Sequence, residues 1–263
     1  MWDDPELYEL ENADDPAFDL AFWMEVLRER APRRVLELAC GTGRLTLPLA
    51  SLGVAEEIVA VDRSAPFLER LRSRLPSDGS AIRVVEADMR APGLDGEAFD
   101  LVMISFNSLA YLATREDRMA CLRAVRARLA PGGTFAFDLV APRYDFLSEA
   151  TQSCPPLRVD ADHPAPEYGV ARFLRSYTDT YDPATQTLSS TNRYEIHRED
   201  GRVEHRIADL DWHIYFPDEL ELLLEAAGLE VVERYGDYDR GPWNATSRRY
   251  LWLAAGHDTA RDG

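Results

Sequence analysis

Short apolar runs alternate with amphipathic stretches between residues 33 and 140, and this alternation limits the folds that the chain can adopt. The runs RRVLEL, EIVAVD, AIRVVEAD, FDLVMISF and TFAFDLV are rich in Val, Ile, Leu and Phe and bounded by turn residues, as buried parallel strands are. The stretches between them have helical spacing, for example at Met119, Leu122 and Val125, and we expect the Pro-Gly-Gly at 131–133 to stop that helix. The pattern predicts an α/β fold with a doubly wound parallel sheet.

Residues 141–213 break this rhythm. Pro-rich text leads into three alternating segments, ARFLRSYTDTYD, TLSSTNRYEIHRED and RVEHRIADLDWHIY, which are joined by the turn-like sequences Asp-Pro-Ala-Thr and Glu-Asp-Gly. We interpret them as a three-stranded antiparallel β insertion after the fifth strand. The first domain then resumes with the helix PDELELLLEAAG, whose Gly228 is a C-cap candidate, and with the strands LEVVERY and RRYLWLAA.

The segment VLELACGTGRL, residues 35–45, has the pattern of a ligand-binding turn. A strand ends at Glu37, a turn of small residues follows, and a helix begins. Gly41 and Gly43 allow a ligand to approach the backbone, and the start of the helix offers free N–H groups. The dinucleotide fingerprint requires a third Gly three residues after the second. Thr46 stands there instead, which weakens the case for pyrophosphate binding.

Two later acids end the next two predicted strands. Asp62 closes IVAVD, 19 residues after Gly43, where a carboxylate can accept from both ribose hydroxyls. Asp88 closes VVEAD and, with Met89, borders the next part of the crevice. Acidic residues at three neighbouring strand ends describe a pocket for one nucleoside with an attached cationic chain. Such a pocket suits S-adenosylmethionine better than a pyrophosphate.

With these motifs, residues 33–140 resemble the class I S-adenosylmethionine-dependent methyltransferases. The branch that methylates small molecules, which includes amino-sugar and amine N-methyltransferases, is the most similar. The resemblance implies a Rossmann-like seven-stranded sheet with an antiparallel last strand, formed by residues 33–140 and 214–256. It also implies an N-terminal helical lid over residues 1–32 and an insertion, 141–213, that contributes to the acceptor site.

The resemblance further implies S-adenosylmethionine as the cofactor, with Glu37 orienting its sulfonium-bearing part, Asp62 binding the ribose and Asp88 accepting from the adenine amino group. Ala39 departs from the Gly that many members have, but it is small enough that we expect binding to survive. The full set of cofactor-binding candidates is Tyr8, Glu37, Ala39, Gly41, Gly43, Leu45, Asp62, Arg63, Asp88, Met89, Ser105 and Phe106.

The acceptor side follows from the same topology, because the fourth strand must open on the crevice at SFNSLAYL, residues 105–112. We take Tyr111 and His213 as candidate catalytic residues. The candidate substrate-binding residues are Asn107, Tyr144, Tyr215 and Trp243. Structural alternatives remain open: His213 can pack the junction that leaves the insertion, Asn107 can cap the following turn, and Trp243 can cap the final hairpin.

Composition excludes several other chemistries. All 29 basic residues are Arg and none is Lys, which removes P-loop, Schiff-base and pyridoxal-phosphate lysines. A net charge of −18 argues against a nucleic-acid partner. Three separated cysteines give no zinc-ligand or disulfide pattern, and we expect no bound metal. Neither a signal peptide nor a membrane span is evident, so we expect a cytoplasmic protein, monomeric or homodimeric.

These observations favour methyl transfer to a small-molecule acceptor, with an amine nitrogen preferred to a hydroxyl oxygen. An O-methyltransferase acting on a hydroxylated metabolite is the first alternative. A nicotinamide-dependent oxidoreductase on the same sheet and a non-catalytic cofactor-binding protein are the others.

Overall fold

The computed structural model describes residues 4–13, 18–76 and 81–257, which fall into two compact units. The larger unit comprises the described parts of 17–141 and 215–263, and the smaller unit those of 1–16 and 142–214. The division passes through the segment 1–32 that we expected to act as one lid. Helix α1 (Pro5–Glu11) belongs to the smaller unit, whereas α2 (Leu20–Arg30) belongs to the larger one. A lid function stays a prediction.

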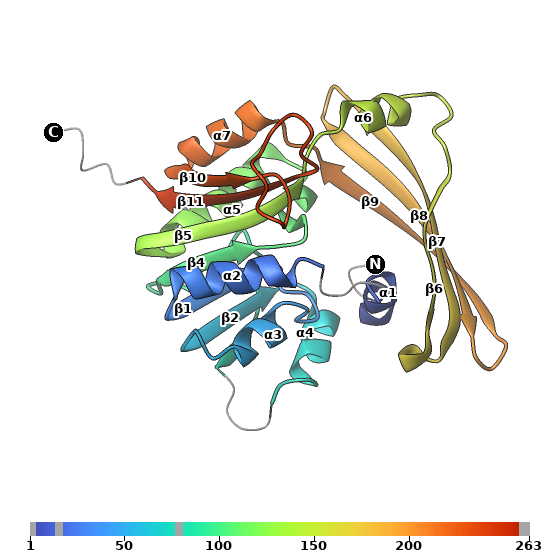
Figure 1. Cartoon of the computed structure of the whole chain (residues 1–263), viewed down its shortest axis with the longest axis horizontal. Coiled ribbons are helices and arrows are strands. Elements are labelled where there is room, and N and C mark those ends of the chain that lie inside the picture. The colour runs from blue at the N-terminus through green and yellow to red at the C-terminus, as the bar shows by residue number, and fades with distance from the viewer. Residues whose placement is uncertain (1–3, 14–17, 77–80, 258–263) are drawn as a thin grey trace. The chain divides into compact units, whose positions relative to one another are not determined.

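A seven-stranded sheet forms the centre of the larger unit, in the order β10-β11-β5-β4-β1-β2-β3 (Figure 1). β11 runs antiparallel to both of its neighbours, and the pairs among β1 to β5 are parallel. The predicted Rossmann-like sheet with an antiparallel last strand is thereby confirmed. The strands are β1 (Arg34–Leu38), β2 (Glu57–Asp62), β3 (Ile82–Glu86), β4 (Phe99–Ile104), β5 (Leu129–Val140), β10 (Leu229–Tyr235) and β11 (Arg249–Gly256).

Helices cover both faces of this sheet: α2 and α3 lie on one face and α5 on the other (Figure 1). The core on the first face joins the buried Phe22 and Trp23 of α2 to side chains of α3, β1 and β4. The helices of the larger unit are α2, α3 (Thr46–Ser51), α4 (Ala65–Arg72), the 3-10 helix η1 (Ser108–Tyr111), α5 (Arg115–Arg128) and α7 (Pro217–Ala226).

The fifth strand of this sheet begins earlier than the predicted run TFAFDLV. α5 ends at Arg128, and β5 begins at Leu129, before the Pro-Gly-Gly that we expected to stop the helix. The pairing register between β4 and β5 shifts between Phe99 and Leu101, so the small residues form an irregular start of the strand. Gly228, with φ of 77°, does follow α7 as expected.

The smaller unit holds a four-stranded antiparallel sheet in the order β6-β7-β8-β9, not the three strands that we predicted. The additional strand, β6, comes from Pro-rich text and lies at the sheet edge, where Pro is tolerated because no ladder N–H is required. Leu7 and Leu10 of α1 pack with Phe173, Tyr194 and Ile196 of this sheet. Its elements are α1, α6 (Tyr144–Ala150), β6 (Arg158–Ala165), η2 (Pro166–Tyr168), β7 (Val170–Asp182), β8 (Thr187–Arg198) and β9 (Val203–His213).

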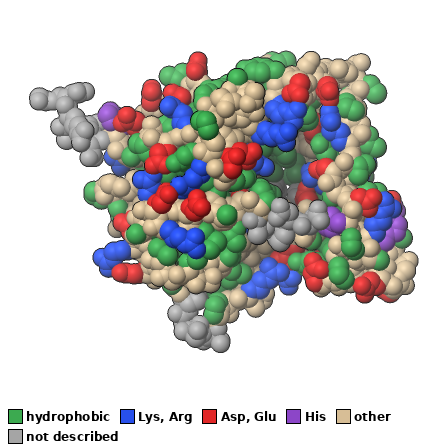
Figure 2. All heavy atoms as spheres, viewed as in Figure 1, with side chains coloured by type: hydrophobic (Ala, Val, Ile, Leu, Met, Phe, Trp, Pro, Cys, Tyr) green, Lys and Arg blue, Asp and Glu red, His purple; other side chains and the backbone are tan. Residues whose placement is uncertain are grey.

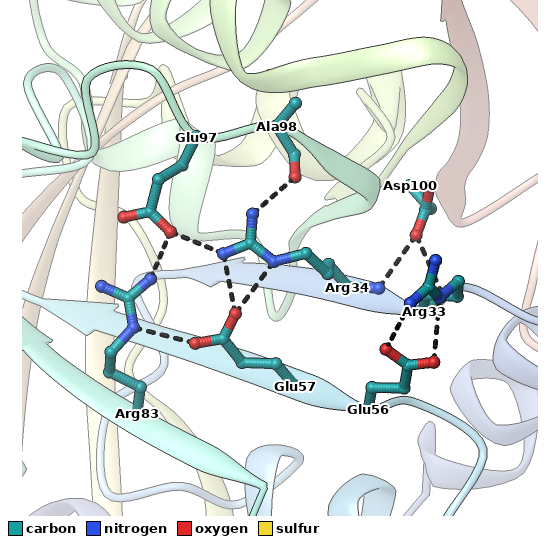
Figure 3. A network of polar contacts seen from close by, with 8 residues as sticks. All are labelled: Arg33, Arg34, Glu56, Glu57, Arg83, Glu97, Ala98 and Asp100. Carbon is teal, nitrogen blue, oxygen red and sulfur yellow. Dashed lines mark hydrogen bonds and ion pairs between the residues drawn. The ribbon is translucent and has the colours of Figure 1, made fainter.

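Arginines and acids form a network at the amino ends of the parallel strands, which we call the amino-end network (Figure 3). Arg34 donates to Glu57 at 2.7 and 2.9 Å and to Glu97 at 2.5 Å, and Arg83 bridges the same two acids. These hydrogen bonds hold the pKa of Glu97 below its usual range, Arg34 contributing most. The network joins β1, β2 and β3 to the segment that enters β4.

Charges of both signs also lie side by side elsewhere on the surface, as Figure 2 shows for one face. Among the described residues, none of the helices has the length and hydrophobicity needed to cross a membrane.

Candidate active site

The turn between β1 and α3 is built on left-handed backbone. φ is 59° at Ala39, 57° at Gly41 and 84° at Gly43. A Cβ at Gly43 would lie 2.3 Å from Leu71 Cδ1, so close packing against α4 also requires glycine there. Ala39 is a non-glycine residue in a conformation that favours Gly, which gives the departure noted in the sequence a physical cost of about 1 kcal/mol. Hydrogen bonds within the chain hold the turn in this shape: the N–H of Cys40 donates to the carbonyl of Val61 at 3.0 Å and the N–H of Gly43 to that of Cys40 at 3.1 Å.

Glu37 lies at the carboxyl end of β1 and is only 2% exposed. Its Oε2 accepts a hydrogen bond from Thr46 Oγ1 at 2.6 Å. Burial raises the pKa of this carboxyl to about 7, although Thr46 and the charge of Arg44 oppose the shift. A cation beside Glu37 would favour its ionised form. Thr46, the residue that replaces the third glycine, is therefore a partner of the predicted ligand-orienting acid.

Asp62, at the end of β2, fixes the glycine turn. Its Oδ2 accepts from the N–H of Gly41 at 2.9 Å and its Oδ1 from the N–H of Ser64 at 2.8 Å. Burial raises the pKa of Asp62 above its usual range, against these backbone hydrogen bonds. The backbone N–H of Arg63 also hydrogen-bonds this carboxylate, which offers about four lone-pair sites, so about one remains for a ligand hydroxyl. The neighbouring Arg63 is exposed and Leu45 is buried.

Asp88 follows β3 and is partly engaged by its own chain. Arg90 donates to its two carboxylate oxygens through Nε at 2.8 Å and Nη2 at 2.7 Å, and through its backbone N–H at 2.8 Å. The hydrogen bonds from Arg90 lower the pKa of Asp88. Arg90 also pairs with Asp117 of α5. Asp88 is half-buried, as is Met89, so an adenine amino group would share this carboxylate with Arg90.

The end of β4 is held by Asp138 of β5, which is completely buried. Asp138 accepts from two consecutive N–H groups, those of Phe106 at 2.5 Å and Asn107 at 3.2 Å. Both residues are left-handed, with φ of 56° and 60°. Asn107 Oδ1 in turn accepts from the N–H of Val140 at 3.0 Å, and Ser105 is buried just before this turn. The side chain of Asn107 thus ties two strand ends together instead of capping η1.

Tyr238, in the loop between β10 and β11, completes the arrangement and was not a candidate from the sequence. Its hydroxyl donates to Asp138 Oδ2 at 3.0 Å. Burial raises the pKa of Asp138 to about 6, while Arg249, with Nη1 3.9 Å away, opposes the shift. Tyr238 and Asp138 are 100 positions apart, so no local sequence pattern predicts their contact. We call Phe106, Asn107, Asp138 and Tyr238 the β4 clamp.

A buried ion pair adjoins this clamp. Both guanidinium Nη atoms of Arg44 bind Asp19, at 2.5 and 2.8 Å, and Asp19 is fully buried. The guanidinium carbon of Arg44 lies 4.7 Å from the centre of the Phe106 ring. Sequence reasoning missed Arg44 and Asp19, although Arg44 immediately follows the glycine turn.

The remaining acceptor-site candidates of the larger unit are Tyr215, Trp243 and Tyr111. Tyr215 is buried, its hydroxyl donates to the carbonyl of Leu109 at 3.1 Å, and burial raises its pKa well above the usual value. The half-buried Trp243 packs its ring 5.9 Å from that of Trp252 across the hairpin. Tyr111 ends η1 and is half-buried. Tyr215 and Trp243 have the contacts of core and hairpin residues, and their binding roles stay predictions.

Three candidates belong to the smaller unit. Tyr8 is buried on α1, where its carbonyl accepts from Asn12 Nδ2 at 2.7 Å. His213 is buried at the end of β9, and Tyr144 is 73% exposed at the start of α6. The other cofactor candidates all lie in the larger unit. The described residues contain no cluster of three His, Cys, Asp or Glu side chains with metal-binding geometry.

The three neighbouring strand ends fit the cofactor that the fold implies. β1, β2 and β3 are adjacent and parallel, so Glu37, Asp62 and Asp88 lie along one edge of the sheet. S-adenosylmethionine presents cationic groups, ribose hydroxyls and an amino group, all of which carboxylates bind. The orientation of Asp62 by backbone N–H groups leaves part of its lone-pair capacity for a ligand.

Comparison with known proteins decides the family. A model of a methyltransferase domain matches residues 35–133. The cypemycin N-terminal methyltransferase of a Streptomyces species is 30% identical over 245 residues, which cover 90% of this chain and 88% of the relative. The chain belongs to the class I S-adenosylmethionine-dependent methyltransferases.

Solved structures of methyltransferases match both units. The CcbJ methyltransferase from Streptomyces caelestis superposes with a TM-score of 0.73 and 26% identity, covering 95% of this chain and 96% of that one. CalS10, an amino pentose methyltransferase from Micromonospora echinaspora solved with S-adenosylmethionine bound, has a TM-score of 0.71 and 22% identity, with the same coverage. The methyltransferase therefore shares its insertion, and not only its cofactor domain, with these proteins. Because the chain belongs to the methyltransferases, we reject the alternative of a nicotinamide-dependent oxidoreductase.

Proposed function

We propose that this methyltransferase transfers the methyl group of S-adenosylmethionine to an amine nitrogen of a small-molecule acceptor. The observation that carries the proposal is the likeness to cypemycin N-terminal methyltransferase over 90% of the chain. An N-terminal methyl acceptor is an amine, and the similarity includes the smaller unit, which we expected to contribute to the acceptor site. A peptide amine is the nearest extension of this substrate class.

The smaller unit contributes a second, physical argument. Glu11, Asp160 and Asp179 gather around one arginine, Arg175, which lies 2.9 Å from both Glu11 and Asp160. Arg175 also donates to Asn192 Oδ1 at 2.7 and 3.0 Å. Arg158 also acts on Asp179, so three acids face two bases and this region of the sheet carries an excess of acids. A negative surface favours a cationic acceptor, such as a protonated amine, over a neutral alcohol.

Amine methylation also needs a proton acceptor, because an ammonium nitrogen has no lone pair for attack. Burial raises the pKa of Glu11 to about 7, against the charge of Arg175. A carboxyl that titrates near neutrality can take up the proton of an amine as it is desolvated. Glu11 joins His213 and Tyr111 as a candidate for this step.

The chain's other tasks are alignment and exclusion of water, since methyl transfer from a sulfonium is an in-line displacement. The bound cofactor supplies the activated methyl group. Glu37, the glycine turn, Asp62 and Asp88 would hold it along the edge of the sheet. The β4 clamp fixes the strand end at which, by the family resemblance, cofactor and acceptor meet.

The test is incubation of the full chain with methyl-deuterated S-adenosylmethionine and matched pairs of amines and alcohols on the same carbon skeletons. Mass spectrometry of the products should show the label on nitrogen. Label on oxygen would replace the proposal with O-methylation. Tight binding of S-adenosylhomocysteine without label on any acceptor would instead favour a protein that binds the cofactor and no longer uses it.

A further inference from the structure

A groove on the larger unit is lined by residues of α5 and α7. Its volume is about 490 Å³, and none of the cofactor candidates lines it. This size lies within the roughly 300–1,000 Å³ typical of small-molecule sites. Its apolar walls include Met119, Leu223 and Leu222, the last of which is 64% exposed.

Three arginines of α5 line the same groove: Arg115, Arg118 and Arg123. Within the described residues, none of the three forms an ion pair, although Glu219 also lines the groove. Most arginines elsewhere in the chain do pair with acids, as Arg34 and Arg83 do in the amino-end network. In a chain with a net charge of −18, three arginines that line one groove and form no ion pair with a described residue are a local exception.

Arg118 gives the cluster its strongest feature. The residue is only 8% exposed, and its Nη1 donates to the carbonyls of Leu112 at 3.3 Å and Ala113 at 3.0 Å. Its Nε is buried and has no acceptor in the part of the chain that the structure describes. A guanidinium has five N–H donors, and a buried charge is costly unless an acceptor or counter-ion accompanies it. An anion in the groove would supply that counter-ion.

We propose that the α5–α7 groove binds a small organic anion, a carboxylate or phosphate monoester that carries a short apolar chain. The anionic head pairs with Arg115, Arg118 and Arg123, since planar guanidinium groups bind both kinds of oxyanion. The apolar chain lies on Met119 and Leu222. The ligand is separate from the cofactor and from the methyl acceptor, so this proposal does not depend on the nature of the acceptor.

The experiment is a calorimetric titration of the full chain with hexyl phosphate and with hexanoate, using inorganic phosphate and hexanol as partial ligands. Saturable binding of at least one alkyl anion, tighter than that of inorganic phosphate and weakened by salt, is expected. Hexanol alone should not bind. Comparison of the two alkyl anions shows which head group the arginines prefer. Absence of saturable binding by both alkyl anions would overturn the proposal.

Variants locate the binding. Arg123 is exposed, so Arg123→Gln should fold normally and weaken binding by about threefold to fivefold, the effect of one exposed charge pair. The double variant Arg115→Gln, Arg123→Gln should weaken it further. Arg28→Gln removes an exposed charge at the end of α2 and serves as the matched control. Equal effects of Arg28→Gln and Arg123→Gln would show that only net charge matters, and would refute the groove.

Leu222→Ser tests the apolar wall without touching a charge. It should weaken hexyl phosphate binding and leave inorganic phosphate binding unchanged. Because Leu222 is largely exposed, its loss should not unfold the chain. An unchanged affinity for hexyl phosphate would remove the apolar chain from the proposed ligand.

Discussion

The two ends of the seven-stranded sheet treat acidic residues in opposite ways. At the amino ends, Glu57 and Glu97 are bound by arginines and keep a pKa below the usual range. At the carboxyl ends, burial raises the pKa of Glu37 and Asp138, and these carboxyls accept from a hydroxyl or from backbone N–H groups. Asp88, which Arg90 binds, is the exception at that edge.

The difference separates stability from function within one sheet. Arginine at the amino ends satisfies each acid with a full opposite charge, so no demand for a ligand remains. At the carboxyl ends, neutral donors orient Glu37 and Asp138, and Arg44 and Arg249 act on these two carboxyls only as nearby charges. We expect a cationic ligand to bind at this edge, where no arginine among the described residues donates a hydrogen bond to either carboxyl. Position in the parallel sheet, and not the residue type, decides which role an acid has.

The largest effect should come from Asp62→Ala. The change removes the expected ribose acceptor and leaves the N–H groups of Gly41 and Ser64 without their partner. Two lost hydrogen bonds of this kind weaken S-adenosylhomocysteine binding by about 100-fold. Calorimetry measures the affinity. Glu56→Ala, at the other end of β2, removes an exposed pair with Arg33 and should leave affinity unchanged; equal losses in both variants would erase the contrast between the two ends.

Asp138→Asn should lower turnover by about tenfold or more, because an amide nitrogen cannot accept from the donors of the β4 clamp. Asp100 is the control, since it accepts from the consecutive N–H groups of Arg33 and Arg34, both at 2.9 Å, at the amino end. Asp100→Asn should reduce stability and spare turnover. Steady-state kinetics of both variants, with cofactor affinity measured separately, decide whether the clamp positions reacting groups.

The same variant carries a pH prediction. The folded pKa of Asp138 is raised to about 6 from a usual value of 3.8, so its stabilising contribution is complete below pH 4 and is lost as the pH rises through 6. The advantage of the natural chain over Asp138→Asn in unfolding free energy should therefore be larger at pH 4 than at pH 7. Urea unfolding at several pH values tests this; an advantage that grows with pH would contradict the raised pKa.

A smaller effect is the release of protons when S-adenosylmethionine binds. With a pKa of about 7, Glu37 is half protonated at pH 7, and a cationic ligand beside it should release about half a proton. Calorimetric titration of S-adenosylmethionine in buffers of different ionisation enthalpy measures that release. Glu37→Gln should abolish it, whereas Glu57→Gln, which changes an acid of the amino-end network, should not. Unchanged proton release in Glu37→Gln would assign the proton to another group.

The smallest effect should follow Glu97→Gln. Ion pairs near the surface contribute about 0.2–1 kcal/mol, so the unfolding free energy should fall by about that amount, and less in concentrated salt. The pKa of Glu97 is lowered in the folded chain, so its contribution is present at neutral pH and is lost as the pH falls through the folded value. Cofactor affinity should not change; a weakened affinity would link the two ends of the sheet.

Local sequence patterns were sufficient to predict the large sheet, because each buried strand has the pattern of an apolar run between turn residues. β6 was missed because its text, RVDADHPA, is charged and contains Pro, and an edge strand tolerates both. The strand-end acids Glu37, Asp62 and Asp88 were found because the turn and the spacing mark them. Tyr238 was missed because its contact with Asp138 spans 100 positions and depends on how the last hairpin folds back.

The bond between Thr46 and Glu37 has an evolutionary consequence. The dinucleotide fingerprint has glycine at the position of Thr46, so a change toward that fingerprint would remove the hydrogen-bond partner of Glu37. Thr46→Gly alone would leave the buried carboxyl of Glu37 without this hydrogen-bond donor. Loss of the Glu37 carboxyl alone would leave the buried hydroxyl of Thr46 without this acceptor. Either substitution alone should therefore lower the stability of the folded chain, and this cost opposes a stepwise change to a dinucleotide cofactor.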